Sequence, residues 1–80
     1  METVRELLRL RDHPLMRVRR RNQVLVSVAM STELEDLLLS VCQAIREKTG
    51  VEIRKTTLMK LATVYVLLRL REKLGLPSPP

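Results

Sequence analysis

The stretch QVLVSVAM, residues 23–30, is the part of the sequence from which the fold is predicted. Apolar side chains occupy its even positions, Val24, Val26, Val28 and Met30. The odd positions are smaller or mixed in polarity, namely Gln23, Leu25, Ser27 and Ala29. This alternation is typical of a β-strand with one buried face. Because a lone strand leaves its backbone groups unpaired, and no second alternating segment is found, we expect it to pair with the same strand of a second copy.

A helical pattern follows this segment and is expected to begin at Ser31 or Thr32. Thr32 followed by Glu35 fits a capping box, and acidic residues load the first turn, where the helix dipole favours negative charge. Gly50 is expected to end the helix. One apolar face is formed by Leu34, Leu37, Leu38, Val41, Cys42 and Ile45.

A second helix is predicted from about Thr56 to Lys73, with Gly75 and Pro77 as stop signals. Its main apolar stripe consists of Leu58, Leu61, Ala62, Tyr65 and Leu68. Further apolar residues make it hydrophobic nearly all round, which indicates burial on more than one face and again favours a dimer. A short amphipathic helical pattern over residues 1–13 is interrupted by Pro14, and it predicts either a small extra helix or a disordered segment.

The composition limits the class of protein. Eighty residues form at most one small domain, which is marginally stable as a monomer. The single cysteine, Cys42, excludes an intramolecular disulfide and favours a reducing compartment, so we expect a cytoplasmic protein. The N-terminus does not have the pattern of a signal peptide, and the longest apolar run, Val64 to Leu68, is too short to span a membrane.

The charge favours a polyanionic partner. The chain has a net charge of +6, and its 15 basic residues are mostly arginine, which suits bidentate contact with phosphate. Four arginines lie just before the predicted strand, at Arg17, Arg19, Arg20 and Arg21. They form either a DNA-contacting arm or a solvated run of charge. Nucleic acid is therefore the first expected partner, ahead of an anionic membrane surface.

No residue pattern predicts an enzyme. The sequence has no glycine-rich phosphate loop, no nucleophile with a nearby base and no spacing typical of metal ligands, so we expect no catalysis, metal, cofactor or small-molecule substrate. The only histidine, His13, is expected in a surface or loop role. Cys42 and Tyr65 are expected in the core, with the Tyr65 hydroxyl reaching its edge.

Two segments carry a resemblance to a known family. VSVAMSTELEDLL runs from the predicted strand into an acidic helix start, and GVEIRKTTLMKLA covers the inter-helix turn and the start of the second helix. Together they resemble the ribbon-helix-helix family of DNA-binding proteins, the MetJ/Arc type, over about residues 20–73. The resemblance implies an α+β, mostly helical homodimer with an intersubunit two-stranded antiparallel ribbon. The domain would span residues 23–75, between an N-terminal extension and basic arm (1–22) and a C-terminal tail (76–80).

The same resemblance implies how DNA is bound. The ribbon would enter the major groove, with Gln23, Leu25, Ser27 and Ala29 facing the base edges. Phosphate would be held near the start of the second helix, by Arg54, Lys55 and Thr56. Two departures from the family are that Leu25 and Ala29 cannot form hydrogen bonds, and that Arg54 stands where a Ser or Thr cap is usual.

Two functions follow as hypotheses. The first is a dimeric transcriptional regulator, such as a repressor, that binds double-stranded DNA. The arginine-rich arm would then carry much of the binding. The second is a dimeric protein-interaction module, antitoxin-like or an assembly partner, without specific DNA readout. The arginines favour the first hypothesis, and the apolar side chains of Leu25 and Ala29 favour the second.

Overall fold

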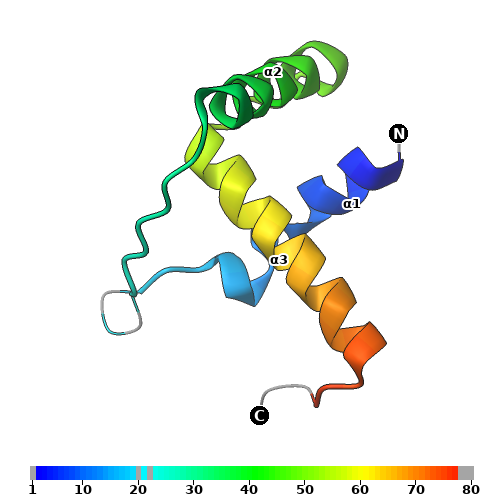
Figure 1. Cartoon of the computed structure of the whole chain (residues 1–80). Helices are drawn as coiled ribbons and strands as arrows, with labels where there is room; N and C mark the ends of the chain where they lie inside the picture. Colours follow the sequence, from blue (N-terminus) through cyan, green and yellow to red (C-terminus); the bar gives the residue numbers. More distant parts are fainter. Residues whose placement is uncertain (1, 20, 22, 78–80) are drawn as a thin grey trace.

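The computed structural model describes residues 2–19, 21 and 23–77. In chain order, the elements are α1 (Glu2–Arg9), two short 3₁₀ helices η1 (Leu10–Asp12) and η2 (Pro14–Met16), α2 (Thr32–Thr49) and α3 (Lys55–Leu74). Helix α3 is the centre of the arrangement, because α1, η1, η2 and α2 all contact it. Figure 1 shows α2 across the N-terminal end of α3, and a long irregular segment that leads from η2 to the start of α2.

The predicted α+β fold with a β-ribbon is wrong for this structure. Residues 23–31 are irregular, and no strand occurs among the residues that the structure describes. Neither set of alternating side chains is buried, since Val24, Leu25, Val26 and Val28 are 80%, 87%, 74% and 64% exposed. The physical reason is that alternation specifies a strand only when a neighbouring strand completes its hydrogen bonds, and no described segment of this chain does so.

Local signals account for the ends of α2. Ser31 is the N-cap, and its Oγ accepts a hydrogen bond of 3.1 Å from the backbone N–H of Leu34. Thr32 is therefore the first helical residue, and the capping box predicted for Thr32 is replaced by the cap at Ser31. The predicted end at Gly50 is confirmed, because this glycine has a left-handed φ of 77° and donates its N–H to the Arg46 carbonyl.

Helix α3 begins one residue before the predicted start and ends one residue after the predicted end. Its N-cap is Arg54, which makes no side-chain capping bond. Gly75 follows the helix with a left-handed φ of 67°, and its N–H bonds to the carbonyls of the last turn. The start of α3 therefore lacks the side-chain support that α2 has at Ser31.

A small core lies where α2, α3 and the N-terminal helices meet. Its buried members are Ile45, Ile53, Leu58 and Leu61. Partly buried side chains from the other elements pack around them, namely Val4, Leu7, Leu8, Leu10, Met16, Leu38, Cys42 and Val51. The apolar face predicted for α2 is divided: Leu38 and Cys42 face the core, whereas Leu34, Leu37 and Val41 are exposed.

Helix α1 is joined to α3 by a polar cluster. The Tyr65 hydroxyl donates a 2.9 Å hydrogen bond to the Glu6 carboxylate, and Arg69 forms an ion pair with the same oxygen at 3.0 Å. The Arg69 guanidinium also lies 4.9 Å from the centre of the Tyr65 ring. Of the two possibilities that the amphipathic pattern leaves open for the N-terminus, a small helix or a disordered segment, the structure shows the helix, packed against α3.

Candidate nucleic-acid interface

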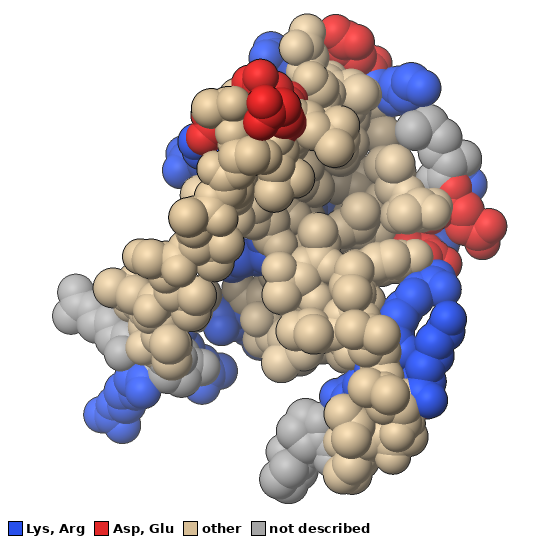
Figure 2. Space-filling view, viewed as in Figure 1, with Lys and Arg blue, Asp and Glu red and all other residues tan. Residues whose placement is uncertain are grey.

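The arginine-rich segment lies on the irregular link between η2 and α2. Arg17, Arg19 and Arg21 are all exposed. Arg20 lies outside the residues that the structure describes. In Figure 2, basic side chains gather at the lower left, at the far end of this link, while the acidic side chains visible on this face lie over other parts of the molecule. The segment therefore presents positive charge apart from the acidic residues seen in that view.

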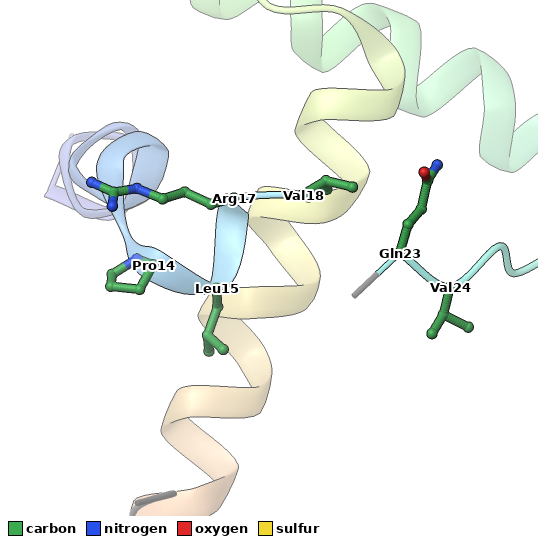
Figure 3. A pocket seen from close by; sticks show the side chains of 6 residues that line it. All are labelled: Pro14, Leu15, Arg17, Val18, Gln23 and Val24. Atoms are coloured by element: carbon green, nitrogen blue, oxygen red, sulfur yellow. The ribbon is translucent and has the colours of Figure 1, made fainter. Parts of the chain in front are cut away.

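A surface hollow of about 310 Å³ adjoins this segment. It is lined by Pro14, Leu15, Arg17, Val18, Gln23 and Val24 (Figure 3). Two of the predicted site residues, Arg17 and Gln23, thus line the same hollow, with side chains that extend in different directions (Figure 3). Among the described residues that line this hollow, Arg17 is the one with a charged side chain, and Gln23 adds a polar amide.

The residues predicted to read bases do not form a separate outward face. Gln23, Leu25, Ser27 and Ala29 are exposed, and so are the even-numbered residues Val24, Val26 and Val28. The prediction that the side chains at even positions form a core is wrong. Of these residues, Met30 alone is half-buried, and the other three are exposed. Among the predicted readers, only Gln23 and Ser27 have side chains that form hydrogen bonds.

The start of α3 is a second cluster of predicted phosphate contacts. Arg54, Lys55 and Thr56 are exposed there. The ammonium of Lys55 lies 3.3 Å from a carboxylate oxygen of Glu35 in the first turn of α2. Exposed ion pairs of this kind are worth at most about 1 kcal/mol, so Lys55 can exchange Glu35 for another anion. Figure 1 places the α2–α3 junction at the opposite end of the irregular link from the arginines, so the two clusters are not brought together.

The two other residues considered for a chemical role, His13 and Cys42, both contact neighbouring parts of the chain. The Nδ1 atom of His13 accepts a 3.1 Å hydrogen bond from the Leu15 N–H and caps η2, a role that the sequence did not predict. Cys42 is half-buried against the core. Within the described part of the chain, no group of three or more metal-ligating side chains is assembled. Nor is any helix there both long and apolar enough to cross a membrane.

Comparisons with protein-family models, with curated proteins and with solved structures found no match to this chain. The function is therefore argued from its own residues. Sequence reasoning missed the cluster of Glu6, Tyr65 and Arg69. Its partners are 59 and 63 positions away in the chain, too far for any local pattern to indicate.

Proposed function

We propose that this protein binds double-stranded DNA through the arginines of residues 17–21. The observation that carries the proposal is the exposed position of Arg17, Arg19 and Arg21 on a link that leads away from the helical core. A guanidinium binds phosphate through two parallel hydrogen bonds, and an exposed cluster of them attracts a polyanion over a distance of about one Debye length. The net charge of +6 acts in the same direction.

The neighbouring side chains supply two further kinds of contact. Gln23 and Ser27 can donate and accept hydrogen bonds at base edges or phosphates. Lys55, at the start of α3, can release Glu35 and bind a second stretch of backbone, where the N–H groups of the first helical turn also attract phosphate. Because most of these contacts are to phosphate, binding is expected to depend weakly on sequence. To act as a small transcriptional regulator, such as a repressor, the protein would need base contacts from Gln23 and Ser27 in addition to these phosphate contacts.

One observation favours the alternative of a protein-interaction module. The apolar side chains of Val24, Leu25 and Val26 are among the most exposed of the chain, and they directly follow the arginines. Exposed apolar residues in a row are typical of contact with a protein rather than with DNA. The two functions differ in how strongly salt weakens binding, because only DNA releases condensed counterions.

The test is a salt titration of binding to duplexes of unrelated sequence. Replacing Arg17 and Arg21 by alanine removes two phosphate contacts, so the slope of log K against log salt should become shallower by about 1.8. Affinity should fall by a similar factor for every duplex. The matched control replaces Arg46 and Lys48, at the other end of α2, and removes the same charge.

The control variant should keep the wild-type slope of log K against log salt. If the variant without Arg17 and Arg21 also keeps that slope, these arginines do not contact DNA. A wild-type protein that binds no duplex at low salt would contradict the proposal as a whole.

A further inference from the structure

The chain exposes more surface than a compact protein of its size. Its accessible surface is 7129 Å² for a mass of 9.3 kDa. A compact monomer of this mass exposes about 5,000 Å², which leaves an excess of about 2,100 Å². The radius of gyration is 13.9 Å, against about 12 Å expected for a globular chain of this length. Among the described residues, 15 large hydrophobic side chains are exposed.

Two helices carry apolar stripes that nothing in the described chain covers. On α2, Leu34, Leu37 and Val41 recur at spacings of three and four residues and are all exposed. On α3, a second exposed stripe consists of Val66, Leu67, Leu70 and Leu74. Figure 2 shows uncharged side chains over much of α3 and the irregular link. Such spacings are typical of a helix that packs along another helix.

We propose that a second copy of this chain covers both stripes, with α2 of one copy packed along α3 of the other. Charge complementarity supports this pairing. Helix α2 contains four acidic and two basic residues, whereas α3 contains one acidic and five basic residues. A two-fold axis places α2 against α3 twice, so opposite charges meet in both contacts. Pairing α3 with α3 would instead bring ten basic residues together.

The area also fits a second copy. Twice the excess surface is about 4,000 Å², and the stripes of α2 and α3 form part of it, whereas obligate homodimers bury about 2,000 Å² or more in all. A single foreign helix would cover one stripe and leave the other exposed. A second copy covers both stripes with the same contact repeated. This inference does not depend on DNA binding, because none of the arginines of the arm takes part in it.

The experiment is sedimentation equilibrium at micromolar concentration. The wild-type protein should have twice the mass of the 9.3 kDa chain. Leu37→Glu and Leu70→Glu each place a charge in one of the two stripes and should weaken dimerisation at least tenfold. The matched control is Gln43→Glu, which adds the same charge to an exposed position of α2 away from the stripe and removes only the exposed hydrogen bond from the Gln43 amide to Glu47. It should leave the dimer intact.

A cross-linking measurement covers the case in which a glutamate variant fails to fold. Two chains are prepared with Cys42→Ser, one carrying Leu37→Cys and the other Leu70→Cys. On oxidation, the mixture should form disulfides between positions 37 and 70, identified by peptide mass. A monomeric wild type, glutamate variants that dimerise like the wild type, or links only between identical positions would each overturn the proposed packing.

Discussion

At the scale of single residues, Glu6 makes the most connected polar contact of the chain. Its carboxylate accepts the Tyr65 hydroxyl and pairs with Arg69, so one side chain of α1 holds two of α3. The hydrogen bond from Tyr65, followed by that from Arg69, lowers the pKa of Glu6 from its ordinary value of 4.5. The same hydrogen bond is the main cause that raises the pKa of Tyr65 above 10.0. The lowered pKa of Glu6 and the raised pKa of Tyr65 therefore have the same main cause, the hydrogen bond that joins α1 to α3.

This bond predicts a titration that can be observed directly. Tyr65 is the only tyrosine and there is no tryptophan, so the ultraviolet absorbance of tyrosinate reports this residue alone. Replacing Glu6 by alanine removes the acceptor, and the pKa of Tyr65 should fall back towards 10.0. Glu2→Ala, elsewhere on α1, should leave the titration unchanged. Identical titration curves for the two variants would mean that the Glu6–Tyr65 bond does not form in solution.

At the scale of the elements, the helices were predictable because their signals are local. The start of α2 is determined by Ser31 and an acidic first turn, and its end by Gly50, all within a few residues of the boundary. The segment 23–30 was predicted wrongly because its alternation says which side chains share a face, but not whether another strand is present. The apolar face of α2 was predicted, but the exposure of Leu34, Leu37 and Val41 was not, since periodicity indicates an apolar face without indicating what packs against it.

The cap of α2 predicts that alanine substitutions at two adjacent residues differ in their effect on the free energy of unfolding. Ser31→Ala removes the oxygen that accepts the Leu34 N–H, so the free energy of unfolding should fall by about 1 kcal/mol. Thr32→Ala is the control, because its hydroxyl contacts only the neighbouring Glu33 side chain in the described structure, and its effect should stay within about 0.5 kcal/mol. Chemical denaturation measures both. If Thr32→Ala costs as much as Ser31→Ala, the capping box predicted at Thr32 is the better description.

At the scale of the whole molecule, the contacts that were not predictable connect distant parts of the chain. The pairing of Lys55 with Glu35 neutralises part of the phosphate site expected at the start of α3, and it joins residues 20 positions apart. By contrast, the exposure of Arg17, Arg19 and Arg21 was predictable, because charged side chains are rarely buried. Residue type therefore indicates which side chains are exposed, but not which of them lie close together.

The small core predicts how the molecule unfolds. Among the described residues, five hydrophobic side chains are buried, namely Ile45, Ile53, Leu58, Leu61 and Val64. That is little for a chain of 80 residues, so the contact with a second copy should supply much of the stability. Unfolding of a dimer into two chains depends on concentration, and each tenfold increase should add about 1.4 kcal/mol to the apparent stability.

For a dimer of this size, the midpoint of thermal unfolding should therefore rise by about 3–5 °C per tenfold increase in protein concentration. Calorimetry or circular dichroism over two decades of concentration measures this. Leu37→Glu should lower the midpoint and remove its dependence on concentration, because it weakens the contact between copies. Gln43→Glu should behave like the wild type. A wild-type midpoint that stays constant across the range would show that the five buried side chains suffice, and that a single chain is the folding unit.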